Sequence, residues 1–196
     1  RPCGSSGGWR GGDGGSGGPA VTTGTGPDAT TAGARGPLGP AVQDCYPDDF
    51  AHCYGCGRLN PQGHHLKTYW DGRESRTRFT PAPHHVAVPG FVYGGLIASL
   101  FDCHSTATAA AAAATHAGQR LGDGPLARFV TASLQVDYLK PTPLGPELDL
   151  RGWATEVTDR KVVVEAELRA AGVVTARARA VAVRLPEAMA RPPGSS

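Results

Sequence analysis

The chain has 196 residues, of which 40% are hydrophobic, and a formal net charge of +2. This length allows one domain with a sizeable core, and the nearly balanced charge argues against nucleic acid or a charged membrane surface as a partner. No apolar run approaches the roughly 20 residues of a membrane-spanning helix. Five cysteines are an odd number that favours free thiols over a disulfide framework, so we expect a reducing, cytoplasmic compartment.

The chain divides into one predicted domain and two tails. Residues 1–43 are rich in Gly, Ser, Thr and Pro and show no hydrophobic period. Such a segment buries too little surface to offset its ordering entropy, which predicts disorder. The domain is expected to span residues 44–186. Residues 187–196 are polar and proline-containing, and we expect them to be disordered as well.

The domain begins with turns and a hairpin. Residues 45–63 combine Cys, Gly, Asn and Pro in a way that predicts a string of turns. Residues 66–70 read as a strand, Asp71 and Gly72 predict the hairpin turn, and residues 75–79 form the returning strand.

The next segment is the centre of the predicted domain. From Pro89 to Ala114 it reads PGFVYGGLIASLFDCHSTATAAAAAA, which predicts a tight turn, a glycine pair and one long helix ending near Gly118. Alanine has the highest helix propensity and little bulk. A sheet can therefore pack closely around this helix.

Four strand-like runs follow the helix, at residues 129–138, 148–157, 162–169 and 174–183. The first alternates between apolar and polar residues, with Thr131 on the polar face. Their order predicts an antiparallel meander of four strands in an α+β domain, with a long central helix wrapped by a curved antiparallel sheet. Because one helix covers only one face of such a sheet, we expect an oligomer to cover the other.

Three segments carry a family resemblance: CYGCGRLNPQG from Cys53, PGFVYGGLIASLFD from Pro89 and DYLKPTPLG from Asp137. Together they resemble the hotdog-fold acyl-CoA thioesterases, in the branch that holds the phenylacetate-operon-type and thioesterase-superfamily-member proteins. The resemblance covers about residues 45–185. It implies a hotdog fold, acyl-CoA as substrate, and a homodimer or homotetramer with the active site at the subunit seam.

The resemblance also implies roles for individual residues. The N–H groups of Gly94 and Gly95 would polarise the thioester carbonyl, and Asp102 would act as general base or nucleophile with help from Thr131. Amides at a helix N-terminus lack intrahelical partners and suit a developing oxyanion. Gly95 and Asp102 are separated by roughly 10 Å along the helix axis. One helix cannot place both on one carbonyl carbon, so a second chain is expected to complete the site, without metal or other cofactor.

Two departures from the family pattern leave an alternative open. Tyr93 stands where relatives usually carry a histidine next to the glycine pair, and we expect it to shape the site. Ala87 stands where some relatives carry an asparagine that helps to orient water. His84, His85 and His104 are candidates to compensate for the missing imidazole. The alternative is an acyl-CoA-binding module that senses its ligand without turnover.

Two further sets of residues allow more than one interpretation. Lys140, Arg160 and Lys161 suit the phosphates of coenzyme A, although solvated turn charges explain them equally well. A cysteine-rich set, formed by Cys53, Cys56, Cys45 and His52, resembles a metal knuckle. A closed site needs four ligands and the chain has no second Cys-x-x-Cys, so we favour a turn packed on the sheet and expect no metal.

Overall fold

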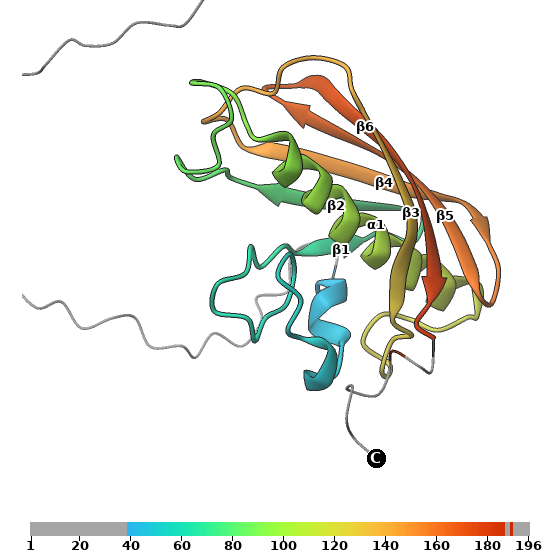
Figure 1. Ribbon diagram of the computed structural model, residues 1–196. Coiled ribbons are helices and arrows are strands. Elements are labelled where there is room, and N and C mark those ends of the chain that lie inside the picture. Colours follow the sequence, from blue (N-terminus) through green and yellow to red (C-terminus); the bar gives the residue numbers. More distant parts are fainter. Residues whose placement is uncertain (1–38, 187–188, 190–196) are drawn as a thin grey trace, which may run out of the picture. The chain divides into compact units, whose positions relative to one another are not determined.

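The computed structural model describes residues 39–186 and residue 189, which Figure 1 shows in colour. The first of these lie within the predicted N-terminal tail, yet Ala41, Val42 and Gln43 are buried. Two short 3-10 helices follow, η1 at Val42–Cys45 and η2 at Asp48–Phe50. The rest of the predicted tails lies outside the described residues, apart from Met189, which is exposed.

The predicted hairpin, helix and later strands are all confirmed. Gly118 has a φ of +75° just beyond the end of the helix, where a left-handed residue commonly ends the hydrogen-bond ladder. No helix within residues 39–186 is long and apolar enough to cross a membrane. The elements are β1 (Thr68–Trp70), β2 (Glu74–Phe79), α1 (Gly94–His116), β3 (Phe129–Tyr138), β4 (Leu148–Val157), β5 (Lys161–Ala170) and β6 (Val173–Arg184).

The six strands form one antiparallel sheet in the order β1-β2-β4-β5-β6-β3. The predicted meander of four strands is therefore wrong, because β3 pairs with β6 at the far edge and only β4, β5 and β6 form a meander (Figure 1). The connection between β3 and β4 holds Pro141 and Pro143, which have no N–H to donate. It pairs instead with the loop before the helix, at Phe91 and Pro143.

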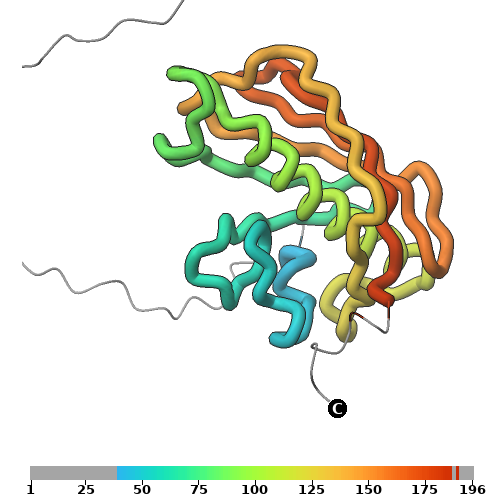
Figure 2. The backbone as a smooth tube through the Cα atoms, in the orientation of Figure 1, coloured from blue at the N-terminus to red at the C-terminus, as the bar shows by residue number. Residues whose placement is uncertain are grey.

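Helix α1 lies against the concave face of the sheet, which curves around it in Figure 2. The close approach that the alanine-rich helix predicted is present. Four alanines on one face of β6 are at most 3% exposed, as are four alanines of the helix, Ala107, Ala109, Ala110 and Ala111. Small side chains on both sides let the backbones come close while still excluding water. The four alanines of β6 are Ala176, Ala178, Ala180 and Ala182.

The opposite face of the sheet is charged. Arg179 pairs with Glu165 at 3.3 Å, and Arg151 pairs with Glu74 at 2.5 Å. Charged residues on this face interact well with water, although Trp153 lies on the same face and is 38% exposed. The expectation that an oligomer covers this face stays a prediction.

Candidate active site

The N-terminus of α1 carries the glycine pair. The residue before it, Tyr93, has an extended backbone (φ −61°, ψ 127°) and its side chain makes no capping hydrogen bond. Among the described residues, the N–H groups of Gly94 and Gly95 have no hydrogen-bond acceptor. Two free donors at the positive end of a long helix form a suitable place for an oxyanion.

Two tyrosine rings flank these glycines. The hydroxyl of Tyr138 donates a hydrogen bond of 2.7 Å to the carbonyl oxygen of Gly94. The ring of Tyr93 lies 2.4 Å from the position that a Cβ of Gly95 would occupy, so any side chain there would displace the ring. Burial, and after it the neighbouring Tyr93, raises the pKa of Tyr138. Tyr138 lies in the third family-like segment, but sequence reasoning did not assign it to the site.

A second group of candidate residues lies further along the helix. Asp102 is half-buried, and its Oδ1 accepts a hydrogen bond of 2.5 Å from the hydroxyl of Thr131 on β3. The structure thus brings together two residues that the sequence analysis singled out. A threonine hydroxyl that donates to a carboxylate fixes its orientation and leaves the second oxygen available.

A β-bulge explains how Thr131 reaches the helix. The register of β3 against β6 shifts between Thr131 and Ser133, so Ala132 is an extra residue in the strand. Thr131 pairs with the fully buried Ala182 and faces α1 together with Leu134. The prediction that Thr131 lies on the polar face is therefore wrong, because one inserted residue reverses the alternation and redirects the side chain.

The two groups are separated within one chain. Asp102 follows Gly95 by about two helical turns, which is roughly 10 Å along the axis. Tyr138 contacts the glycine end and Thr131 contacts the acid, so β3 runs past both groups. In the described chain β3 is also the last strand of the sheet, and its outer edge has no neighbouring strand.

Exposed apolar side chains gather beside this edge. They come from the loop before α1 and from the end of β3, which the contacts of Tyr138 and Phe91 bring together. Contiguous exposed apolar surface of this kind marks a binding site or an interface. The members are Val86, Val88, Phe91, Tyr93, Tyr138 and Leu139, each at least 41% exposed.

His104 does not replace the missing histidine. It is fully buried on the sheet side of α1, with Nδ1 2.9 Å from the hydroxyl of Thr77 and Nε2 3.1 Å from the hydroxyl of Ser75. Burial lowers its pKa to about 3, so the ring is neutral at physiological pH. A Cβ on Gly152 would come within 2.7 Å of Nε2, so this glycine makes room for the ring. His104 is a structural residue.

The other two histidines lie in the loop before α1. His84 is exposed, and its ring centroid is 4.3 Å from that of His85. The Nδ1 atom of His85 accepts a hydrogen bond of 3.0 Å from the N–H of Ala82. The carbonyl oxygen of His85 accepts a hydrogen bond from the N–H of Tyr93. His85 thus supports the residue before the glycine pair through its backbone.

The cationic residues are not gathered in one chain. Lys140 lies next to the start of β6, where its N–H donates to the carbonyl oxygen of Thr175. Arg160 lies next to the end of β6, where its carbonyl oxygen accepts the N–H of Arg184. At about 3.3 Å per residue, the two positions are roughly 30 Å apart. Lys161, beside Arg160, pairs with Glu156 at 2.7 Å.

The cysteine-rich segment has a different third member from the one expected. The Sγ atoms of Cys53, Cys56 and Cys103 all lie within 4.8 Å of one another. Cys45 packs in a separate apolar cluster and His52 is exposed, so neither belongs to this group. Nothing in the local pattern marks Cys103, because it lies on α1, far along the chain.

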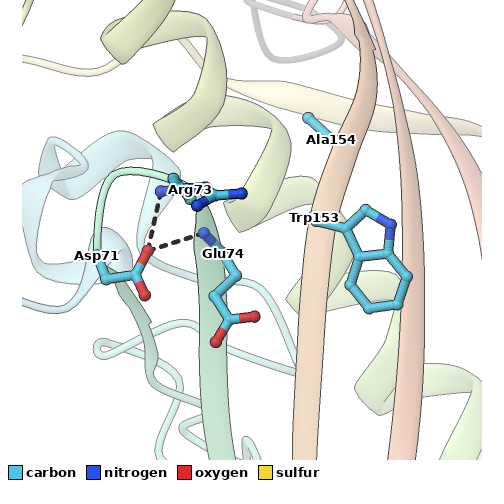
Figure 3. Close-up of a pocket in the computed structure, with 5 residues that line it drawn as sticks. All are labelled: Asp71, Arg73, Glu74, Trp153 and Ala154. Atoms are coloured by element: carbon cyan, nitrogen blue, oxygen red, sulfur yellow. Dashed lines mark hydrogen bonds between the residues drawn. The ribbon is translucent and has the colours of Figure 1, made fainter.

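An open hollow of about 640 Å³ lies at the other side of the sheet, between the β1–β2 turn and β4 (Figure 3). None of the candidate residues lines it. The carboxylate of Asp71 accepts the N–H groups of Arg73 and Glu74 at 2.8 Å each, so it stabilises the turn. The other lining residues are Trp153 and Ala154. The hollow thus lies at the surface beside the β1–β2 turn, three strands away from Thr131.

Comparisons with known proteins agree with the fold. The thioesterase superfamily model matches residues 89–181. A solved thioesterase superfamily protein from Shewanella loihica PV-4 is 48% identical, with a TM-score of 0.55, and the match covers 72% of this chain and 100% of that one.

Two more distant proteins are similar to parts of this chain. The acyl-coenzyme A thioesterase THEM4 of Xenopus laevis is 32% identical over 91 residues, or 46% of this chain, which spans only 35% of that protein. The E. coli PaaI protein from the phenylacetic acid degradation operon is 14% identical, with a TM-score of 0.51. The match covers 63% of this chain and 81% of that chain, and it shows the shared fold alone. The long helix on a curved antiparallel sheet is the hotdog fold, and the chain belongs to the thioesterase superfamily.

Proposed function

We propose that the chain hydrolyses acyl-CoA thioesters to a free carboxylic acid and coenzyme A. The observation that carries this proposal is the half-buried Asp102, held by Thr131 on a helix whose N-terminus offers two free N–H groups. A carboxylate and an oxyanion site are the two elements that hydrolysis of an activated carbonyl requires. The name of the Xenopus relative supports acyl-CoA as the substrate class.

The proposed chemistry begins with the thioester carbonyl oxygen accepting hydrogen bonds from Gly94 and Gly95. Asp102 removes a proton from a water molecule, whose oxygen attacks the carbonyl carbon. The tetrahedral intermediate places its negative charge on the oxygen held by the two N–H groups. Its collapse breaks the C–S bond and releases the coenzyme A thiolate, which takes up the proton. Thr131 keeps the carboxylate oriented throughout, and direct attack by Asp102, followed by hydrolysis of the anhydride, is the variant route.

A second copy of the chain completes the site in this proposal. Two β3 edges that pair antiparallel about their midpoint, near Leu134 and Gln135, set Tyr138 of each chain opposite the partner's Thr131. Tyr138 contacts Gly94 and Thr131 contacts Asp102, so this pairing brings donors from one chain to the acid of the other. The exposed apolar residues beside this edge favour such an interface. The resulting assembly is a homodimer, or a homotetramer built from two of them.

The same pairing proposes a site for the coenzyme A phosphates. Lys140 lies at the Tyr138 end of β3, whereas Arg160 and Lys161 lie at the Phe129 end of the sheet. An antiparallel pair brings these two ends together across the interface. Cations from both chains then face one anionic ligand, with Tyr93 beside the acyl group.

The second candidate function is an acyl-CoA-binding module without turnover. The contact of the Tyr93 ring with Gly95 favours it, because the ring occupies space beside one of the two N–H donors. This alternative predicts tight binding of acyl-CoA esters and negligible hydrolysis.

The test is a coenzyme A-release assay with short, long and aryl acyl-CoAs, run with wild type and Asp102→Asn, together with calorimetric binding of the same esters. We expect turnover by wild type and a loss of about 10²–10⁴-fold in kcat for the variant, with retained binding. Equal turnover by both proteins would remove Asp102 from the mechanism. Binding without release by wild type would establish the module instead.

A further inference from the structure

The segment from Cys53 to Gly57 folds as a knuckle. The N–H of Gly57 donates to the carbonyl oxygen of Cys53 at 2.7 Å, which closes a tight turn with both cysteine side chains on it. A Cβ on Gly57 would lie 2.5 Å from the backbone of Ala51 and Cys53. Only glycine allows the chain to close at this point. The sequence Cys-x-x-Cys-Gly thus produces a turn that presents two sulfur atoms together.

The third sulfur comes from helix α1. The Sγ atom of Cys103 lies 3.7 Å from that of Cys53, and all three sulfurs are within 4.8 Å of one another. Gly55 makes this approach possible, because a Cβ there would lie 2.3 Å from the Cys103 sulfur. The knuckle therefore has glycine at the point where the third thiol must enter.

One of the three sulfur–sulfur separations matches the spacing that a thiophilic ion needs, and the other two are at most 4.8 Å. At a Zn–S distance of about 2.3 Å, a tetrahedral centre sets its sulfur ligands roughly 3.8 Å apart. The Cys53–Cys103 separation of 3.7 Å already has this value. Cys56 and Cys103 are buried and Cys53 is half-buried, so the centre is shielded from water on one side and open on the other.

We propose that Cys53, Cys56 and Cys103 form a zinc-binding site with three thiolate ligands and a fourth position on the half-buried side for water or an exchangeable donor. Binding converts three thiols to thiolates and releases three protons, with no change of redox state. The ion would fix the turn-rich segment from Cys53 to Leu66 onto α1 next to Asp102. The site is independent of the hydrolytic proposal.

The test uses the full-length chain in a Cys3→Ser background, reduced and freed of metal with a chelator. Zn²⁺ is titrated with a chromophoric competitor, and Co²⁺ is added separately as a spectroscopic probe. We expect one ion per chain, a thiolate-to-cobalt charge-transfer band, and a rise of the melting temperature with zinc. The substitutions Cys53→Ser, Cys56→Ser and Cys103→Ser should each weaken zinc binding at least about 10-fold, whereas Cys45→Ser should leave it unchanged.

Any of three outcomes would overturn the proposal. One is a reduced wild-type protein that binds less than one Zn²⁺ per chain or gives no charge-transfer band with Co²⁺, a result that depends on no variant. Another is unchanged binding by a folded Cys103→Ser protein. A disulfide between Cys53 and Cys103 that persists in the reductant would likewise contradict the three-thiolate site.

Discussion

The two halves of the candidate site differ in how the fold holds them. At the glycine end of α1, the donors are backbone N–H groups without partners, flanked by two tyrosine rings that are more than half exposed. At the acid end, Asp102 is half-buried and hydrogen-bonded to Thr131 across the helix–strand contact. The glycine end is exposed and its N–H groups lack acceptors among the described residues, whereas the carboxylate at the acid end is half-buried and held in one orientation.

This difference indicates that neither half is a complete site. Within residues 39–186, no carboxylate is hydrogen-bonded to the N–H groups at the glycine end, and the carboxylate at the acid end accepts its one side-chain hydrogen bond from Thr131. The roughly 10 Å between them along the helix is too long for both to act on one carbonyl carbon. The exposed edge of β3 runs past both halves, and it is the part of the fold through which a second chain can join them.

The largest expected effect comes from removing the acid. Asp102→Asn keeps the shape of the side chain but removes its basicity, so kcat should fall about 10²–10⁴-fold. Because the residue is half-buried and has one hydrogen-bond partner, urea denaturation should show a change of less than about 1 kcal/mol in the unfolding free energy. A variant that retained full kcat would show that Asp102 takes no part in the chemistry.

One N–H donor at the glycine end can be removed while Asp102 is left unchanged. Tyr93 has the extended backbone that a following proline prefers, and Gly94 is the first helical residue, where proline is well tolerated. Gly94→Pro therefore removes one free N–H, and kcat should fall about 10²–10³-fold. The matched control is Gly94→Ala, whose Cβ meets the ring of Tyr138 at an ordinary 3.5 Å and whose N–H is kept. Equal losses in both variants would argue against the oxyanion role.

The sheet-facing side of α1 supplies a stability control. His104 has a pKa of about 3 in the folded protein and an ordinary value of 6.5. Between pH 6.5 and pH 3 the unfolded chain binds a proton at His104 that the folded chain does not bind. The contribution of His104 to the unfolding free energy is therefore fully present above pH 6.5 and is lost as the pH decreases. The loss should be about 1.4 kcal/mol per pH unit, or about 2 kcal/mol at pH 5.

Urea denaturation at pH 7 and pH 5 measures this effect. His104→Gln lacks the titrating ring, so its unfolding free energy should change less between the two pH values than that of wild type. The variant should keep the wild-type kcat per folded molecule, because the ring faces away from Asp102. The same pH dependence in both proteins would contradict the buried neutral histidine.

The smallest expected effect concerns the orientation of the acid. Thr131→Val removes the hydroxyl that donates to Asp102 and keeps the shape of the side chain, so kcat should fall about 10-fold through loss of one charge-assisted hydrogen bond. Thr131→Ser restores the donor and should recover most of the activity in the same assay. A serine variant as slow as the valine variant would assign Thr131 a packing role only.

The elements of this fold could be predicted from the sequence because their signals are local. Alternation marked the strands, alanine content marked α1, and Gly118 marked its end. The pairing of β3 with β6 could not be read in the same way, since it depends on where the chain crosses after Tyr138. Three prolines in that connection, Pro141, Pro143 and Pro146, were the available signal.

The site residues show the same division. Asp102, Gly94 and Gly95 lie on one helix, where spacing along the sequence gives position directly. Thr131 was identified through the family resemblance, but the face of the strand on which its side chain lies was mispredicted. A one-residue bulge cannot be recognised in the apolar–polar alternation of the 10 residues of β3. Cys103 was missed as a neighbour of the knuckle, because the contact joins segments that only the tertiary fold brings together.

The most direct test of the divided site mixes two inactive proteins. Asp102→Asn and Gly94→Pro chains are unfolded together, refolded, and assayed for acyl-CoA hydrolysis, with gel filtration and differential tags showing that hybrid oligomers form. If each site takes its donors from one chain and its acid from the other, random pairing should restore about a quarter of the wild-type activity, because half of the pairs are hybrids with one intact site each. Hybrids that form and remain inactive, or a protein that elutes as a single chain while fully active, would contradict the account.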